Sequence, residues 1–457
     1  MPTANGYAIL SGMPFRRFFD RGAKQQAPPT EPDEDRLEAE ETEPSAEPEE
    51  PEEASEIDDR VDWRSRAAAV LPTGASTGSK RADALYGSSD AVGPTHFVQA
   101  VGCRVTDVDG NTYIDCGMAL GAVALGHAEP NVTRAVIDAA AHGNVSGLSS
   151  AREVDVAERL CGVIPCAEMV QFLKTGAEAM AAGVRIARTY TGRDIVVGCG
   201  YFGWLDWSST AEGVPAATRG SYRNVPFDDV AALESAARAA GDKLAAIVLE
   251  PVIERLPSAE WIAKARELCD SRGAVLIFDE IKTGFRLRTG GYQSYADVTP
   301  DLAAFGKAMA NGYPLAAIVG RRDVMEAARR TWISSTLASE ATALAAAAAV
   351  LDWHNQAEIT ESLWTTGAEI RKAVNAAIEA SGIDGVLVDG IDPMWLLRFD
   401  DQSREQRFLE LAASHGVLFK RGAYNFSALA HDEDAIQEIE SAASAAFVEL
   451  LEEEAHE

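Results

Sequence analysis

The sequence predicts an α/β fold: a large domain with a mostly parallel sheet covered by helices, followed by a smaller α+β domain. Two observations carry this prediction. Short apolar runs alternate with helical stretches between about residues 169 and 305, the pattern of parallel strands covered on both faces. From about residue 352 the alternation gives way to a helix, two strands and a last helix. The 457 residues suffice for a large core and two packed domains.

The individual elements follow from periodicity and turn signals. A helix is expected over 63–70, and a hairpin over 97–115 turns at Asp109-Gly110. The expected strands of the alternating region are 169–173, 195–197, 245–249, 275–278 and 302–305. The expected helices around them are 131–141, 151–163, 177–190, 230–240 and 259–271. Later strands are expected near 386–388 and 395–399, with a helix from Glu433.

These elements divide the chain into four expected segments. Residues 1–60 form an acidic N-terminal extension, and the Glu- and Pro-rich part at 25–60 has too few apolar residues to offset its ordering entropy, so we expect it to be disordered. The basic, aromatic stretch 7–21 is a possible docking peptide for a protein partner, with a plain disordered tail as the alternative. We expect 61–110 to join the small domain, 111–350 to form the large domain and 351–457 to form the small α+β domain.

Composition excludes several partner classes. Asp and Glu number 71 against 41 Lys and Arg, a net charge of −30, which repels nucleic acid and anionic membranes. The longest apolar run, 341–351, is alanine-dominated and indicates a packed helix, not a membrane span. The N-terminus shows no signal pattern, so we expect a cytoplasmic protein. Six scattered cysteines without CxxC spacing and seven histidines without ligand spacing indicate reduced thiols and no metal site.

The candidate catalytic residues lie at the ends of predicted strands. Lys307 follows the apolar run 302–305 and Gly306, and Asp279 follows the run 274–278. Open α/β sheets bind their ligands at this edge. Two ordinary loop charges are the alternative for this pair of residues.

Three further strand ends add to this pair. Thr175, Gly176 and Ala177 open a helix after a strand, where free N–H groups and the helix dipole suit a phosphate, or where Thr175 acts as an N-cap. Tyr201 lies in an aromatic loop at 201–207, which suits stacking on a flat ligand or packing on the core. Glu250 adds a third strand-end acid, which needs a cation or a proton.

Together these residues describe a site for pyridoxal 5'-phosphate. The cofactor requires a phosphate cradle, a stacking aromatic residue, an Asp that keeps the ring nitrogen protonated, and a Lys that forms a Schiff base. The protonated ring is the electron sink for the substrate carbanion. The lysine is displaced by the substrate amine and then acts as the general base.

The chain from about residue 64 to 451 resembles the class III aminotransferases of pyridoxal-phosphate fold type I, in particular the glutamate-1-semialdehyde aminomutase-like branch. The resemblance rests on the order and spacing of nine motifs: 107–115, 126–127, 173–179, 187–193, 200–203, 250–252, 276–286, 305–314 and 334–340.

The resemblance implies a role for each cofactor-site residue. Lys307 would carry the Schiff base and Asp279 would pair with the pyridine nitrogen. Ile281 and Tyr201 would contact the two faces of the ring, and Glu250 would lie near O3′. Phe202 would contribute from the aromatic loop. The phosphate would be held by Thr175, Gly176 and Ala177. Thr336 would reach the phosphate of a neighbouring subunit, which implies a homodimer with its active site at the interface.

Several positions depart from the family pattern. Ala177 replaces a Ser or Thr, Phe202 replaces a His, and Ser339-Glu340 replaces Asn-Pro. The segment 208–227 is too short for the gating loop of the aminomutase, and 422–427 lacks the acidic residue expected there. We therefore favour an aminotransferase over a 2,1-aminomutase. A non-catalytic scaffold is a third hypothesis, which the presence of Lys307 and Asp279 opposes.

The substrate side is less defined. The resemblance makes Lys80 and Arg81 candidates for a substrate carboxylate, with a solvated pair as the alternative. Trp204, Tyr313 and Tyr424 could line the pocket. We expect a small-molecule amine or amino-acid donor and an oxo-acid, aldehyde or keto-sugar acceptor, and the sequence identifies neither.

Overall fold

A computed structural model describes residues 62–296 and 298–456. The acidic extension at 1–60 and its possible docking peptide at 7–21 lie outside the described residues. Among the described residues, no helix is both long and apolar enough to cross a membrane, and no three His, Cys, Asp or Glu side chains are grouped as metal ligands. The six cysteines are free thiols, and all but the half-buried Cys161 are buried.

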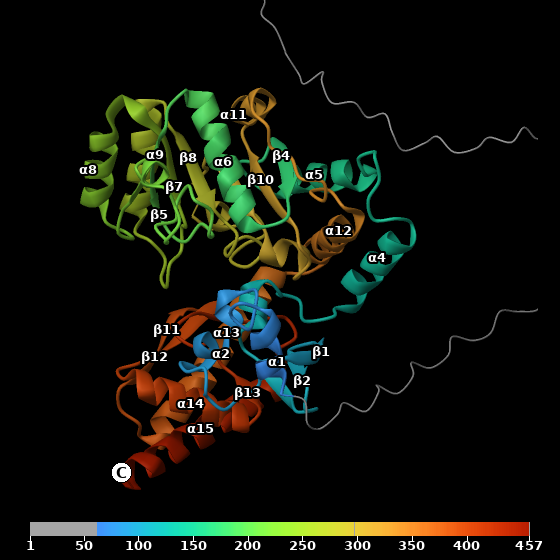
Figure 1. Ribbon diagram of the computed structural model, residues 1–457, viewed down its shortest axis with the longest axis vertical. Helices are drawn as coiled ribbons and strands as arrows, with labels where there is room; N and C mark the ends of the chain where they lie inside the picture. Colours follow the sequence, from blue (N-terminus) through green and yellow to red (C-terminus); the bar gives the residue numbers. More distant parts are fainter. Residues whose placement is uncertain (1–61, 297, 457) are drawn as a thin grey trace, which may run out of the picture. The chain divides into compact units, whose positions relative to one another are not determined.

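A seven-stranded sheet forms the centre of the large domain (Figure 1). Its order is β4-β10-β9-β8-β7-β5-β6, and every pairing is parallel except those of β10 with β4 and β9. The strands are β4 Met169–Leu173, β5 Ile195–Cys199, β6 Tyr222–Asn224, β7 Leu244–Leu249, β8 Val275–Asp279, β9 Leu302–Phe305 and β10 Ala316–Gly320. The expected mostly parallel sheet is confirmed.

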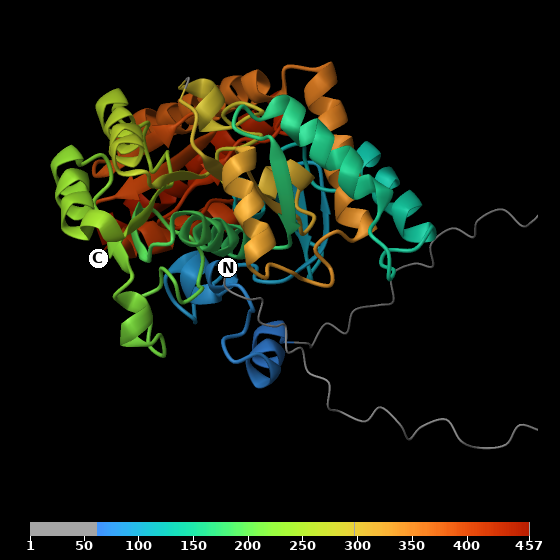
Figure 2. The same cartoon turned by 90° about the horizontal axis from the view of Figure 1, so that it is seen from above.

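The two faces of this sheet belong to two separate hydrophobic cores. Ala246 and Val248 face α6 (Gly176–Thr191), whereas Ile247 and Leu249 face the other core. The helices of that second core are α4 Pro130–Ala141, α5 Ala151–Val163, α8 Val230–Ala240, α9 Ala259–Arg272 and α12 Ala341–Gln356. Figure 2 shows α4 and α5 on one flank and α8 and α9 on the other. Burial on both faces explains the near-continuous apolar strand sequences.

The C-terminal part packs with the N-terminal hairpin strands. A three-stranded sheet has the order β11-β12-β14, and a four-stranded sheet has the order β1-β2-β3-β13. The strands are β1 Phe97–Val101, β2 Arg104–Asp107, β3 Thr112–Asp115, β11 Val386–Ile391, β12 Met394–Phe399, β13 Val417–Leu418 and β14 Asn425–Phe426. One core joins residues as distant in sequence as Tyr86, Ile114 and Phe447. The domain boundaries at 110 and 350 stay predictions.

The remaining helices complete these layers. The longer ones are α1 Trp63–Val70, α13 Ile359–Ser381, α14 Gln402–Ser414 and α15 Glu433–His456. The short ones are η1 Gly78–Lys80, α2 Ala82–Tyr86, α3 Met118–Gly121, α7 Ala216–Arg219, η2 Gly241–Lys243, α10 Tyr292–Tyr295, η3 Lys307–Ala310, α11 Arg322–Met325 and η4 Glu326–Arg330.

Two strands of the large sheet were not expected from the sequence. β6 has only three residues, too few for a periodicity signal. β10 follows β9 after the connection 306–315 and runs antiparallel to it. A parallel return needs a crossover of a dozen or more residues, and this connection is shorter, so the chain turns back beside β9. The expected hairpin at Asp109-Gly110 joins β2 to β3, and a second turn separates β1 from β2.

Candidate active site

The strand ends meet because the central strands are parallel and in register. Cys199 of β5 pairs with Leu249 of β7, which pairs with Phe278 of β8. The next residue of each strand therefore lies at the same edge, and among these are Glu250 and Asp279. Asp279 also pairs with Ala304 of β9, two residues before Gly306-Lys307. The sheet thus delivers two carboxylates and one amine to one edge.

Lys307 sits in a strained backbone conformation at this edge. It begins the turn η3 with φ of 46°, the left-handed region that costs a side-chain-bearing residue about 1–2 kcal/mol. Its pKa is lowered, chiefly by burial and next by the neighbouring cation Lys282, against the opposing effects of Asp279 and Glu250. A lysine in this state is an activated amine nucleophile.

Asp279 is a buried carboxylate with one oxygen free for a ligand. Its side chain is 5% exposed, and Oδ1 accepts a 3.0 Å hydrogen bond from the Ile281 N–H. Within the described part of the chain, Oδ2 has no hydrogen-bond partner. Burial first, and then the Glu250 charge, raise the pKa of Asp279 to about 8. This environment suits a cationic partner, such as a protonated ring nitrogen, that restores the ionised form.

Ile281 connects the start of α6 to the lysine turn. A methyl group placed on Gly176 would lie 3.1 Å from Ile281 Cδ1, and one placed on Gly306 would lie 3.1 Å from the same atom. The side chain therefore touches both the helix N-terminus and the residue before Lys307. The structure brings these sequence-predicted elements together.

The start of α6 is compatible with both roles considered for Thr175, the N-cap and the phosphate site. Thr175 is the N-cap, and its Oγ1 accepts a 3.2 Å hydrogen bond from the Glu178 N–H. The first two N–H groups of the helix, those of Gly176 and Ala177, have no intrahelical partner. The hydroxyl is engaged in capping, while these N–H groups and the positive end of the helix dipole are available to an anion.

The aromatic loop after β5 packs tightly against this helix start. Gly203 has φ of 88°, and a Cβ on it would lie 2.4 Å from the Ala177 Cβ. Tyr201 is 75% exposed, and its N–H donates to Glu250 Oε2 at 3.1 Å, so its ring is free to cover a flat ligand. Phe202 is buried and its ring stacks on Trp207 with a centroid distance of 5.4 Å; its expected place beside the cofactor stays a prediction.

Thr336 forms no hydrogen bond with these groups in the described chain. It is exposed in the turn that precedes Glu340. Glu340 Oε1 accepts from Lys174 Nζ at 2.8 Å, which ties this turn to the residue before Thr175. No hydrogen bond or ion pair of the described chain joins Thr336 to Lys307.

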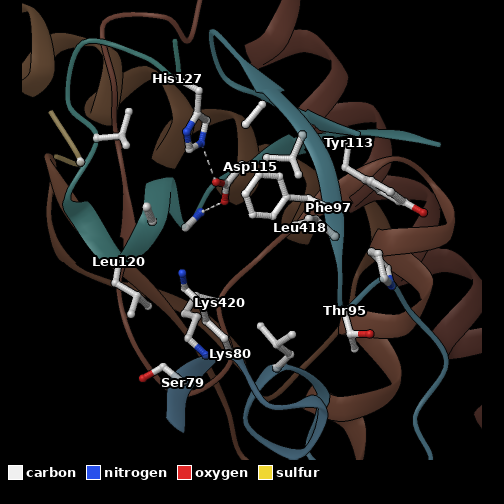
Figure 3. A pocket seen from close by; sticks show the side chains of 18 of the residues that line it. Ser79, Lys80, Thr95, Phe97, Tyr113, Asp115, Leu120, His127, Leu418 and Lys420 are labelled. Atoms are coloured by element: carbon white, nitrogen blue, oxygen red, sulfur yellow. Dashed lines mark hydrogen bonds and ion pairs between the residues drawn. The ribbon is translucent and has the colours of Figure 1, made fainter. Parts of the chain in front are cut away.

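A cavity of about 460 Å³ lies beside the lysine turn (Figure 3). Its wall includes residues 311–314, which directly follow that turn in the chain. Asn311 fixes this wall, since its Oδ1 accepts from the N–H groups of Ala124 and Leu125, each at 3.0 Å. Of the predicted substrate residues, Lys80 and Tyr313 line the cavity.

The other predicted substrate residues lie outside this cavity. Trp204 is exposed and Arg81 is half-buried. Tyr424 covers Lys282, whose Nζ is 4.1 Å from the ring centre, and its hydroxyl accepts from the Glu254 N–H at 2.7 Å.

Sequence reasoning missed two lysines. Lys282 is 9% exposed and its Nζ lies 2.5 Å from Glu250 Oε1; its position in the motif 276–286 could have indicated it. Lys420 is 8% exposed, lines the cavity and donates to the Ala84 carbonyl at 3.0 Å. No sequence signal marks Lys420, because it follows a strand of only two residues.

Comparison with known proteins decides the family. The family model described as aminotransferase class-III matches residues 87–199 and 210–439. The chain belongs to the class III aminotransferase family. It is 33% identical over 397 residues to the 2'-deamino-2'-hydroxyneamine transaminase of Streptomyces kanamyceticus, covering 85% of this chain and 98% of that protein. It is 34% identical over 424 residues to the glutamate-1-semialdehyde 2,1-aminomutase of Roseiflexus castenholzii, covering 84% and 95%.

Solved structures agree with this family assignment. The FumI protein of Sphingopyxis sp. MTA144, solved in its PLP internal aldimine form, matches with a TM-score of 0.81 and 27% identity over 86% of this chain and 97% of that one. The predicted family, fold type I and pyridoxal phosphate cofactor are confirmed. The expected enzyme class, a pyridoxal-phosphate-dependent transaminase, is confirmed at the level of the family.

The residues of this class III aminotransferase fit the cofactor. The free N–H groups of Gly176 and Ala177 suit its phosphate, and the unpaired oxygen of Asp279 suits its ring nitrogen. Gly203 lets the aromatic loop pack directly on Ala177 at the helix start. When bound, pyridoxal phosphate supplies a reactive carbonyl and an electron-withdrawing ring.

We predict that Gly203→Ala weakens cofactor binding at least about tenfold, because the added methyl collides with Ala177 and displaces the loop. Gly213→Ala is the matched control: Gly213 also has φ of 88°, but a Cβ there meets nothing within 4 Å. Titration of the apo-protein with pyridoxal phosphate, followed by absorbance, measures both affinities. Equal affinities for the two variants would contradict the packing argument.

Proposed function

We propose that the protein transfers an amino group between an amine or amino-acid donor and a separate oxo-acid, aldehyde or keto-sugar acceptor. The observation that carries this proposal is the convergence of Lys307, Asp279 and the start of α6 at one sheet edge. Lys307 Nζ is the amine that reacts with the cofactor carbonyl and then moves the substrate proton. Asp279 holds the proton on the ring nitrogen, and Gly176 and Ala177 donate to the phosphate.

The remaining cofactor residues position the ring. Ile281, between Gly176 and Gly306, supports one face, and the exposed Tyr201 covers the other. Glu250 holds the Tyr201 backbone and lies on the O3′ side. Thr175 contributes as the N-cap of the phosphate-binding helix.

The second candidate is an intramolecular 2,1-aminomutase, since relatives of both activities match the chain at similar identity. The segment 208–227 favours the transaminase. It holds the four-residue helix α7 and the strand β6, and it has little length for a gate that would retain a diamine. A non-catalytic scaffold is disfavoured by the buried Asp279 and the activated Lys307.

One assay separates these functions. The pyridoxal form, incubated with single amino donors, is expected to release a stoichiometric amount of oxo-acid. Lys307→Ala should bind the cofactor noncovalently and lose at least about 10³-fold in turnover, because it removes both nucleophile and base. Rearranged substrate without oxo-acid would identify the aminomutase. Near-wild-type turnover of Lys307→Ala would remove Lys307 from the mechanism.

We propose a homodimer in which Thr336 reaches the partner's phosphate site. The turn carrying Thr336 adjoins an exposed apolar surface: Leu148 is 84% exposed, and Trp332 and Leu337 are exposed as well. The Ala341 N–H donates to the Asn144 carbonyl at 2.9 Å, which joins the two segments. Exposed apolar side chains gathered beside a site mark an interaction surface.

We predict that Leu148→Glu dissociates this dimer and lowers cofactor affinity, because the charge is buried in the interface and Thr336 is withdrawn from the partner. Light scattering gives the mass in solution, and the absorbance titration gives the affinity. Val70→Glu, at an exposed apolar residue of α1, is the control. A monomeric wild-type protein with full cofactor affinity would rule out the shared site.

We propose that the cavity beside the lysine turn admits a substrate with an anionic group. Lys80 and Lys420 both line it, and neither forms an ion pair within the described ranges of the chain. Asp115 and His127, also in its wall, are paired with each other at 3.0 Å. Burial first, and then Arg421, lower the pKa of Lys420, and a bound anion would favour its charged form. Arg81, Trp204 and Tyr424 remain candidates outside this cavity.

We predict that Lys420→Met raises the KM for a carboxylate-bearing donor about tenfold or more and changes kcat little, because a charge-assisted hydrogen bond is lost. Lys80→Met should do the same, while Lys243→Met, on the exposed turn η2, should not. Steady-state kinetics with a carboxylate-bearing and a neutral amine donor make the measurement. An equal rise in KM for both donors would exclude an anion subsite.

Two wider proposals concern location and partners. The free, mostly buried thiols support the proposed cytoplasmic location. The stretch 7–21 remains a proposed docking peptide, and full activity of a protein lacking residues 1–60 would be consistent with that role.

A further inference from the structure

Lys282 is a buried cation of the cofactor site without an assigned role. It directly follows Ile281 and is 9% exposed. Its Nζ lies 2.5 Å from Glu250 Oε1 and 4.1 Å from the centre of the Tyr424 ring. A buried ammonium is costly unless it is paired. Glu250 and the Tyr424 ring face together satisfy this charge.

Glu250 extends this contact to the stacking loop. While Oε1 binds Lys282, Oε2 accepts the Tyr201 N–H at 3.1 Å. The loop approaches closely, since a Cβ on Gly200 would lie 2.5 Å from the Glu250 Cβ. Lys282 therefore positions the Glu250 carboxylate, which in turn accepts the hydrogen bond from the Tyr201 backbone.

Lys282 also affects the protonation of Lys307, together with the other charged groups nearby. Asp279 and Glu250 favour its protonated form, whereas Lys282 and Arg286 oppose it. Arg286 is fully buried and donates to the carbonyl groups of Pro393, Ser427 and Gly121. Burial lowers the pKa of Arg286 to about 9, and no described carboxylate contacts it. The two members of the Lys282–Glu250 pair therefore act on the pKa of Lys307 in opposite directions, and the effect of Lys282 is the larger.

We propose that Lys282 is a positioning residue that keeps Glu250 paired and thereby sets the charge balance of the cofactor site. The inference rests on the proposed function of Lys307. Lys282 pairs with Glu250 whether or not the nitrogen of Lys307 carries a proton, which leaves Asp279 to the ring nitrogen.

Neutralising Lys282 and neutralising Glu250 should shift the protonation of the Lys307 nitrogen in opposite directions. Lys282→Met leaves Glu250 as an unpaired anion, which stabilises a proton on the nitrogen of Lys307. Glu250→Gln leaves Lys282 as an unpaired cation, which destabilises that proton. The double variant removes both charges together.

The test is a pH titration of the absorbance of the bound cofactor in the purified holoenzyme. Relative to wild type, we expect the midpoint to rise by about one pH unit in Lys282→Met and to fall by about one in Glu250→Gln. The midpoint of the double variant should lie between those of the two single variants. Lys282→Arg keeps the charge and should also titrate near wild type.

Lys264→Met is the control, because Lys264 is paired with Glu234 and Glu267 on the surface instead of in the site; its midpoint should not move. Shifts of one sign, or no shift, in Lys282→Met and Glu250→Gln overturn the inference. If Lys282→Met fails to fold, Glu250→Gln and Lys282→Arg still decide it. A wild-type protein without a cofactor band overturns the proposed function as well, whereas a band with an unmoved midpoint overturns only this inference.

Discussion

Burial of charge at one sheet edge is the constraint on which the rest of this structure depends. Parallel, in-register strands place Glu250, Asp279 and Lys307 together, and the Lys282 that follows β8 joins them. Two carboxylates and two amines in a water-poor site are tolerated only if each has a partner. Glu250 and Lys282 satisfy each other, and Asp279 and Lys307 are left with shifted pKa values. That imbalance prepares the site for a cationic ring and a reactive carbonyl.

Close backbone packing holds the neutral part of the site. Glycines at 176, 203 and 306 let Ile281 and Ala177 approach at distances that a Cβ would prevent. These apolar contacts fix three elements to one another without polar side chains: the N-terminus of α6, the lysine turn and the aromatic loop. The N–H groups and the Asp279 oxygen remain free for the ligand. The strained backbone of Lys307 is maintained by the buried strand before it and by the Asn311 contacts after it.

The sheet edge and the cavity beside it draw on different parts of the chain. Lys80 and Lys420, which both line the cavity, come from segments far apart in sequence. Asp115 and His127 in its wall are paired with each other, whereas neither lysine forms an ion pair in the described part of the chain.

The sequence by itself determined the α/β class, most element positions, the cofactor and the residues of the sheet edge, because apolar runs and strand-end motifs are local signals. The register of the sheet turned those signals into one site. Tertiary structure alone decided that Phe202 turns into the core, that Lys282 pairs with Glu250 under Tyr424, and that Lys420 joins Lys80. These outcomes depend on contacts between distant segments. The antiparallel β10 likewise follows from the length of its connection, which periodicity does not encode.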